Sequence, residues 1–229
     1  MLSKFGRFVR VSGLARMPRR YFSEEVSSAM KQLSAILKEE IKGELEHKDH
    51  QESASEAEKI FQQAGWKLTE EPHSTRMILE KKIDGTTVTL AFEAKAQEQK
   101  PEETEENEEE EAQEDSGVEF SIFLGRDKQK KVVMDCYSSN GQLEIANLSV
   151  LDSKNVDDLL KDRTIFFSRS LYAGPSFESL DERVQEKVHA YLAAVGVEER
   201  ILSELERKAY AKEQKLYTNW LKNFDELLQ

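Results

Sequence analysis

The chain has 229 residues, of which 34% are charged and 38% are hydrophobic, and its formal net charge is −12. This length is sufficient for a real hydrophobic core, and the composition is too rich in apolar residues for a wholly disordered chain. The single cysteine excludes an intrachain disulfide, and no segment is apolar over the roughly 20 residues that a membrane-spanning helix needs.

The first 22 residues, MLSKFGRFVRVSGLARMPRRYF, contain six basic residues and no acid, with apolar residues among the arginines. This pattern is typical of an amphipathic mitochondrial presequence, and the uninterrupted apolar stretch of a secretory signal is absent. We expect processing after Phe22, so that a single acidic domain, 23–229, remains in the mitochondrial matrix. The alternative interpretation is a basic tail that binds nucleic acid or lipid.

Residues 23–229 carry a net charge of −18, because all six basic residues of the first segment are removed from the total of −12. A charge of this size repels nucleic acid and anionic membranes and attracts basic proteins.

From Glu24 to about His47 the apolar residues recur at spacings of three and four, which predicts one amphipathic helix. Its apolar stripe consists of Val26, Met30, Leu33, Leu37, Ile41 and Leu45. This period is lost between 47 and 65.

Between 66 and 150 the period is two, which predicts β-strands with one buried face and one wet face. Asp84-Gly85 and Asn140-Gly141 are dipeptides that favour tight hairpin turns. The expected strands are 66–71, 75–83, 86–94, 117–126, 131–139 and 142–150, with a seventh near 165–171. The short connections predict an antiparallel meander.

An acidic run lies between the third and fourth of these strands, inside a segment, 97–116, that we expect to be a disordered loop. Its ten carboxylates are Glu102, Glu103, Glu105, Glu106, Glu108, Glu109, Glu110, Glu111, Glu114 and Asp115. Like charges at close spacing without apolar burial oppose folding. The run is either a solubilising loop or a docking surface for basic partners, and it lacks the layout of an EF-hand calcium loop.

The last third of the chain predicts two helices. Ser179-Leu-Asp-Glu182 has the pattern of a capping box, and Gly196 is placed to end this first helix in a left-handed conformation. The second helix is expected from about 198 to 228. The apolar stripe of the first consists of Leu180, Val184, Val188, Leu192 and Val195, and that of the second of Leu202, Leu205, Ala209, Leu216, Trp220, Phe224 and Leu227.

The sequence contains no constellation that indicates catalysis, a metal or a cofactor, so we expect none of the three. Cys136 lies in a strand alternation and is interpreted as a core residue. His47 and His50 with Asp49 could hold a metal weakly, but polar residues after a helix are the simpler interpretation. Neither a Walker A motif nor Gly-x-Gly-x-x-Gly occurs.

The stretches YAGPSFESLDERVQEKVHAYLAAVGV and KEQKLYTNWLKNF resemble the signature of the mitochondrial acidic matrix protein family. This family is also called the mitochondrial glycoprotein family, and it includes the animal receptor for the globular heads of the first complement component. The order of elements agrees over nearly all of 23–229, whereas residue matches begin at Tyr172. The matching positions are Tyr172, Gly174, Pro175, Phe177, Leu180, Asp181, Tyr191, Leu192, Gly196, Lys212, Glu213, Tyr217, Trp220 and Leu221.

The resemblance implies an α+β fold: a strongly twisted seven-stranded antiparallel sheet, flanked by one N-terminal and two C-terminal helices, in a ring-shaped homotrimer. It further implies a non-enzymatic matrix protein that is linked to oxidative phosphorylation, mitochondrial translation and RNA processing. No catalytic residue comes with the family.

Three functional hypotheses follow. The first is a scaffold or chaperone-like protein whose acidic run binds basic partners, such as ribosomal or RNA-processing factors. The second is direct RNA binding by a basic turn with Arg126, Lys128, Lys130 and Lys131, where Phe123 or Tyr137 could stack on bases. The charge of −18 argues against the second. The third, an enzyme, has no supporting residues.

Overall fold

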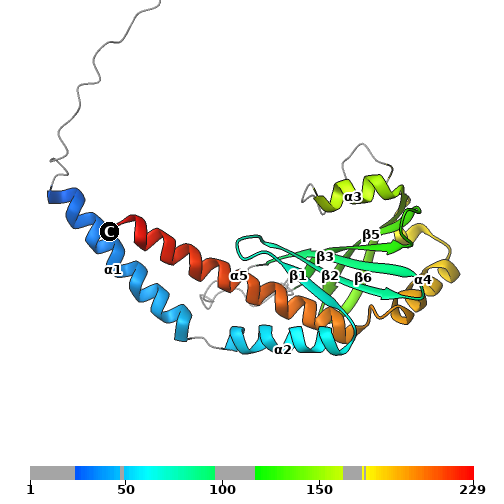
Figure 1. The fold of residues 1–229 in the computed structure, drawn as a ribbon, viewed down its shortest axis with the longest axis horizontal. Coiled ribbons are helices and arrows are strands. Elements are labelled where there is room, and N and C mark those ends of the chain that lie inside the picture. Colours follow the sequence, from blue (N-terminus) through cyan, green and yellow to red (C-terminus); the bar gives the residue numbers. More distant parts are fainter. Residues whose placement is uncertain (1–23, 47–48, 96–116, 162–171, 173) are drawn as a thin grey trace, which may run out of the picture.

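The computed structural model describes residues 24–46, 49–95, 117–161, 172 and 174–229 (Figure 1). Within these residues six antiparallel strands form one sheet in the order β1-β2-β3-β4-β5-β6, which confirms the predicted meander. The strands are β1 (Lys67–Glu70), β2 (Arg76–Ile83), β3 (Thr86–Glu93), β4 (Val118–Gly125), β5 (Lys131–Ser139) and β6 (Gln142–Leu151). The predicted seventh strand at 165–171, the presequence and the acidic run lie outside the described residues.

Five α-helices and one short 3-10 helix accompany the sheet in the described part of the chain. They are α1 (Glu24–Glu46), α2 (Asp49–Gln63), α3 (Ser153–Lys161), η1 (Phe177–Ser179), α4 (Glu182–Ala194) and α5 (Glu199–Leu227). The expected first helix and the two expected C-terminal helices are present as α1, α4 and α5. Two helices were not predicted. Both give a weak apolar pattern in the sequence, because the buried stripe of α2 includes alanines such as Ala57 and because α3 has only nine residues.

Both predicted hairpin turns are confirmed by their backbone angles. Asp84 and Gly85 have φ values of 48° and 76°, and Asn140 and Gly141 have values of 52° and 76°. Positive φ at both central residues is typical of the two-residue hairpin turn whose twist matches that of the two strands it joins. The second turn also contacts α5: Glu206, which is 8% exposed, accepts hydrogen bonds from the Ser138 hydroxyl and, at 3.0 Å, from the Gly141 N–H.

The main core fills the space between one face of the sheet and the layer of α2, α4 and α5. Strand residues such as Leu90 and Phe120 meet Phe61 of α2 and Leu205 of α5 there, and all four are at most 1% exposed. Cys136 belongs to this core, as predicted. Burial raises the pKa of its thiol, so that it is an unreactive core residue.

The expectation that the opposite face of the sheet is wet is wrong at one end. There α3 packs on the sheet, and its Val156 and Leu159 join Ala91, Phe123 and Val133 in a second buried cluster. The short helix therefore gives the sheet a second covered face.

The N-terminus of α4 differs from the predicted capping box. Asp181 is the N-cap, and its carboxylate accepts a hydrogen bond from the Arg183 N–H at 3.0 Å. The Ser179 hydroxyl instead donates to the Ser176 carbonyl at 2.7 Å inside the preceding turn. At the other end Gly196 has φ 95°, so the predicted left-handed ending of α4 is confirmed.

The segment before α4 is fixed against β6. Gly174 has φ 81°, and a Cβ at this position would lie 2.0 Å from the Leu148 carbonyl oxygen, so that no other residue fits. Ser176 forms a bridge with Asn147, and Phe177 is 3% exposed with its ring 5.5 Å from that of His189. Gly174 and Pro175 thus turn the chain into η1 and α4.

The helix α5 has two parts with different surroundings. Its first part crosses the end of the sheet. Glu199 lies against Gly141 of the turn between β5 and β6, and the Ala209 carbonyl accepts a hydrogen bond from the Lys95 N–H at 3.4 Å. Lys212 forms an ion pair with Glu70 of β1. Its second part extends beyond the sheet with α1 beside it (Figure 1). We call α1 together with residues 213–227 of α5 the arm, and the rest of the described chain the body.

A narrow seam holds the two helices of the arm together. The least exposed residues of α1 there recur at spacings of four and three, namely Met30, Ser34, Leu37 and Ile41. At the centre of the seam the Ser34 hydroxyl donates to Asp225 Oδ1 at 2.5 Å, and both residues are at most 9% exposed. The predicted stripe of α1 is therefore partly wrong, because Val26, Leu33 and Leu45 lie outside the seam and are exposed.

Candidate functional site

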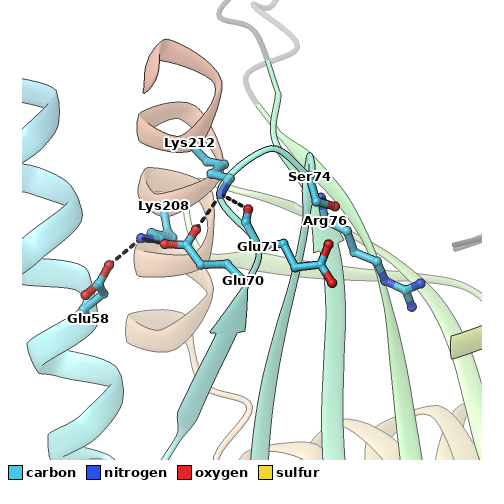
Figure 2. Close-up of polar contacts among 7 residues, drawn as sticks. All are labelled: Glu58, Glu70, Glu71, Ser74, Arg76, Lys208 and Lys212. Atoms are coloured by element: carbon cyan, nitrogen blue, oxygen red, sulfur yellow. Dashed lines mark hydrogen bonds and ion pairs between the residues drawn. The ribbon is translucent and has the colours of Figure 1, made fainter. Parts of the chain in front are cut away.

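The most extensive buried polar cluster in the described chain joins α2, β1 and α5 (Figure 2). Lys208 Nζ lies 2.5 Å from Glu58 Oε1 and 3.2 Å from Glu70 Oε1. Lys212 Nζ lies 3.1 Å from Glu70 Oε2 and donates to the Glu71 carbonyl at 2.7 Å. The side chains of Lys208 and Lys212 are only 5% and 1% exposed. Glu70 is the centre of this network, since it binds both lysines.

The electrostatics of the network explain why two lysines can be buried there. Burial alone would raise the pKa of Glu70, but the hydrogen bonds and charges of Lys212 and Lys208 outweigh it, and the pKa of Glu70 is lowered. Each buried ammonium group has two acceptors, and two carboxylates balance the two positive charges. This arrangement fixes the direction of α5 relative to the sheet.

Two hollows adjoin the network. A groove of about 440 Å³ runs between α5 and the break between α1 and α2. It is lined by Glu44, Leu45, Ala54, Ser55, Glu58, Glu70, Lys208, Ala211, Lys212, Gln214, Lys215, Thr218, Asn219 and Lys222. A smaller cleft of about 230 Å³ lies beside Glu71 and Arg76, where Arg76 Nη1 donates to the Leu160 carbonyl at the end of α3 at 2.8 Å. No catalytic arrangement of nucleophile and base occurs in either hollow among the described residues.

The ten carboxylates of the acidic run lie outside the described residues, but the residues at both ends of that segment are placed. Lys95 Nζ donates to the Gly117 carbonyl at 2.5 Å, and the Lys95 N–H donates to the Ala209 carbonyl of α5. These two flanking residues therefore lie at the end of the sheet that α5 crosses.

The signature residues do not form one site. Gly174, Pro175, Phe177, Leu180 and Asp181 build the turn and the start of α4, as described above. Gly196 ends α4, and a Cβ at this position would lie 2.5 Å from Lys81 Nζ. Tyr217, Trp220 and Leu221 belong to the arm, and Tyr172 is 81% exposed. Most of these residues set turns and helix packing.

The basic turn does not have the stacking residues that RNA binding would need. Phe123 is 2% exposed beneath α3, so its predicted role in stacking on bases is wrong. The Tyr137 hydroxyl accepts a hydrogen bond from the Gly117 N–H at 3.0 Å, and its ring occupies the space where a Cβ of Gly117 would lie. Lys131 Nζ lies 4.0 Å from Asp157 Oδ1 of α3.

Tyr217, Trp220 and Phe224 of α5 form a row on the arm, in which Trp220 is exposed and the other two are half-buried. The rings of Tyr217 and Trp220 are 6.1 Å apart and stacked, and those of Trp220 and Phe224 are 5.5 Å apart. Trp220 is 56% exposed, and the Tyr217 hydroxyl donates to Glu40 Oε1 of α1 at 3.2 Å. Three aromatic residues on one helical face of the sequence indicate packing on the sheet or on another subunit. Packing on the sheet is wrong, because these residues lie beside α1, and packing on another subunit stays a prediction.

The ion-pair network was missed by the sequence analysis. A signal existed: Lys208 and Lys212 are spaced by four residues and follow Leu205 and Ala209 on a helix whose early positions are buried. The acids that pair with them come from distant segments, and pattern alone does not identify such partners.

The weak metal site at His47, Asp49 and His50 involves side chains outside the described part, and the described residues contain no cluster of three metal-binding side chains. Among the described helices, none has the length and apolar character that a bilayer requires.

Comparisons with known proteins agree with this architecture. The sequence profile of the mitochondrial glycoprotein family, MAM33, matches residues 37–228. The mitochondrial acidic protein mam33 of Schizosaccharomyces pombe is 34% identical over 79 residues, which is 34% of this chain and 29% of that relative. The chain thus spans less than a third of that relative in this match.

Two solved structures share the fold. A protein of unknown function from Leishmania major, described as a sequence homologue of the human p32 protein, has a TM-score of 0.65 at 17% identity. The p22 protein of Trypanosoma brucei has a TM-score of 0.61 at 16% identity. Each match covers 88% of this chain, and 99% and 100% of those chains respectively. The chain belongs to the mitochondrial glycoprotein family, a family of mitochondrial acidic proteins.

Proposed function

We propose that the protein is a non-enzymatic scaffold of the mitochondrial matrix that gathers basic protein partners, such as ribosomal or RNA-processing factors. The observation that carries this proposal is the charge of −18 on residues 23–229, with ten carboxylates concentrated between Glu102 and Asp115. Such a scaffold supports mitochondrial translation, RNA processing and, through them, oxidative phosphorylation. The membership of the chain in a family of mitochondrial acidic proteins supports the location and the acidic character.

The binding is electrostatic and multivalent in this proposal. Exposed charges are screened beyond a Debye length of about 8 Å at physiological ionic strength, so binding decreases steeply as salt increases. Single contacts of this kind are weak, and several acidic runs on one assembly make them useful together.

The test is affinity purification from mitochondria with three forms of the protein. The first is unchanged, the second has the nine glutamates and Asp115 of the run replaced by Gln and Asn, and the third has an uncharged Gly-Ser segment of the same length. We expect both altered forms to lose basic partners to the same extent, since charge and not shape is required. Partners that survive both 0.5 M salt and neutralisation contradict the electrostatic mechanism.

We include in this proposal a homotrimer, which the family resemblance implies. The body exposes four large apolar side chains that a second copy would cover, and these are Val150, Tyr172, Val184 and Tyr191. Exposed apolar surface of this kind marks contacts between proteins. Light scattering at micromolar concentration should give three times the mass of one chain, and a monomer mass contradicts the assembly.

Removal of the presequence after Phe22 is the last part of the proposal. N-terminal sequencing of the protein from isolated mitochondria should begin at Ser23, whereas a sequence that begins at Met1 contradicts import with cleavage.

A further inference from the structure

The arm has two flanks of opposite chemical character. The seam residues of α1 and α5 recur at spacings of four and three, so the residue before each seam position lies on one flank and the residue after it lies on the other. On α1 the preceding positions are Ala29, Leu33, Ile36 and Glu40. The seam positions of α5 and its C-cap are Gln214, Thr218, Leu221, Asp225 and Leu228, and the positions that precede them are Glu213, Tyr217, Trp220, Phe224 and Leu227. The following positions include Lys31, Lys38, Lys42, Lys215 and Lys222.

The two preceding flanks lie on the same side of the arm. The helices run antiparallel, with Ser34 opposite Asp225, and the Tyr217 hydroxyl contacts Glu40 across that side. On the other side Lys38 Nζ lies 3.8 Å from Asp225 Oδ2. We call the side with the aromatic row the apolar flank and the side with the lysines the basic flank.

The apolar flank has exposed apolar residues on both helices. Leu33 and Ile36 are 37% and 64% exposed, and Trp220 and Leu227 are 56% and 81% exposed. The Trp220 ring stacks on Tyr217 and meets Phe224 at a tilt. An exposed group of large apolar side chains costs free energy in water, so it indicates a surface that binds something. The stretch from 26 to 40 has a length of about 21 Å, which suits a helix of four turns.

The charges at the rim of this flank select the partner. The ionised side chains described there, Glu40 and Glu213, are both acidic, while the lysines of the arm gather on the basic flank. A second copy that paired through the same flank would bring a second acidic rim against the first. A helix with one apolar stripe bordered by Lys and Arg satisfies both the apolar surface and the rim.

We propose that the apolar flank of the arm binds cationic amphipathic helices of basic client proteins. This inference rests on the proposed function, since it names the part of a basic client that the scaffold recognises. The acidic run supplies long-range attraction, and the apolar flank supplies selection for helical shape.

The test uses the full chain without residues 1–22 and two synthetic 18-residue peptides of Leu and Lys. One peptide has its leucines at helical spacing, and the other is a scrambled sequence of the same composition. Binding is followed by tryptophan emission, because Trp220 is exposed and Trp66 is 2% exposed in the core. We expect a blue shift and binding at least tenfold tighter for the amphipathic peptide than for the scrambled one.

The variant Ile36→Lys places a positive charge on the apolar flank, and Ala35→Lys is the matched control, because Ala35 is the exposed neighbour that follows Ser34 on the basic flank. We expect Ile36→Lys to weaken binding of the amphipathic peptide at least tenfold, and the control variant to bind it with an affinity within twofold of the unchanged protein. Equal binding of both peptides, or equal effects of both variants, overturns the inference. Circular dichroism and light scattering accompany each variant, and an assembly that dissociates with Ile36→Lys shows that a second copy covers the flank, which also overturns it.

The outcome is distinguishable from a failure of the proposed function. If neutralisation of the acidic run removes basic partners while Ile36→Lys has no effect on the peptide, the scaffold stands and the arm inference fails. If Ile36→Lys acts as expected but neutralisation has no effect, the arm binds helices and the electrostatic scaffold fails.

Discussion

The body and the arm bury their apolar residues to very different extents, although the single helix α5 belongs to both. Within the body, Leu202 and Leu205 of α5 are 1% and 0% exposed. Within the arm, Trp220 and Leu227 of the same helix are 56% and 81% exposed. The amino-acid types are similar, so the difference comes from what each part of the helix contacts.

A layer of helices on a sheet covers a wide face of each helix, whereas a pair of helices covers one narrow stripe. In the body, α5 meets the sheet on one side and α2 on another. Among the described residues of the arm, α5 meets α1 along the seam. The described body therefore buries most of its large apolar residues, with Val150, Tyr172, Val184 and Tyr191 as the exceptions, whereas the outer side of the arm leaves apolar residues exposed. This contrast is the basis of the recognition role that we propose for the arm.

The largest expected effect tests the claim that the network holds the body together. Glu70→Gln removes the carboxylate that binds both Lys208 and Lys212 and leaves each buried ammonium group with one fewer charged acceptor. Removal of one partner from a buried ion pair costs about 3–5 kcal/mol, and the side chain of Glu70 is 24% exposed, so we expect the lower end of that range. Urea denaturation followed by far-UV circular dichroism measures the loss.

The control for this prediction is Glu80→Gln, because Glu80 is exposed on β2. A change below about 0.5 kcal/mol is expected there, as for other surface substitutions. The pH dependence gives a second check: the lowered pKa of Glu70 means that its contribution is present above its ordinary pKa and is lost as the solution becomes more acidic. Equal losses for both variants would show that the network contributes little.

The second prediction separates backbone strain from packing between the sheet and α5. Gly85 and Gly141 both have φ 76° in equivalent turns, so Ala at either position costs about 1 kcal/mol in backbone strain. A Cβ on Gly85 meets nothing within 4 Å, whereas a Cβ on Gly141 would lie 2.5 Å from Ser203 Oγ and 2.8 Å from the Glu199 carbonyl oxygen.

We therefore expect Gly141→Ala to lose about 2–3 kcal/mol, and Gly85→Ala about 1 kcal/mol, because overpacking adds to the strain. Thermal unfolding of the two variants side by side measures the difference. If the two losses agree within error, the turn between β5 and β6 does not press against α5.

Periodicity and turn chemistry were sufficient for most of the fold. The six strands follow from alternation and from the two Asx-Gly turns, because both signals act over a few neighbouring residues. The missed helix α2 shows the limit: its buried residues include Ala57 and Phe61, and alanine gives a weak apolar signal. The cap of α4 was placed two residues early, since Ser179 and Asp181 both have side chains that suit a cap.

The sites were less predictable because they depend on contacts between distant segments. Lys208 and Glu58 are separated by 150 positions, and their pairing follows from the packing of α2 on α5. The aromatic row of the arm was recognised as a face in the sequence, but its exposure depends on where the sheet ends beneath α5. Periodicity identifies an apolar stripe and does not tell what covers it.

The third prediction concerns two neighbouring residues of the arm. Leu37 is 7% exposed in the seam, and Ile36 is 64% exposed on the apolar flank. Leu37→Ala should destabilise the seam by about 2 kcal/mol, whereas Ile36→Ala should change it by less than about 0.5 kcal/mol. Hydrogen exchange of α1 amides measures this local stability, and faster exchange confined to the arm is expected for Leu37→Ala. If the exchange of the body amides rises equally, the arm and body unfold as one unit and the division between them is wrong.

The smallest expected effect is a difference in how pH changes the stability of the body and of the arm. Asp135, on the face of the sheet that carries α3, has its pKa raised to about 6 by burial, although the Ser121 hydroxyl bonds to it at 3.2 Å. Asp225 in the arm has its pKa lowered, chiefly by the Ser34 hydroxyl. Between about pH 4 and 6 the folded body thus binds more protons at Asp135 than the unfolded chain does, so this group destabilises the body as pH rises through that window.

Asp135→Asn removes that penalty while it keeps a side chain of the same shape. A shift of two pKa units corresponds to about 3 kcal/mol, and partial access to solvent reduces the expected gain to about 1 kcal/mol. We expect this gain at pH 8 and no gain at pH 4, measured by the midpoint of thermal unfolding, with the exposed Asp127→Asn as control. A gain of equal size at both pH values would mean that the substitution acts through packing, because only ionisation of Asp135 makes its effect on the body depend on pH.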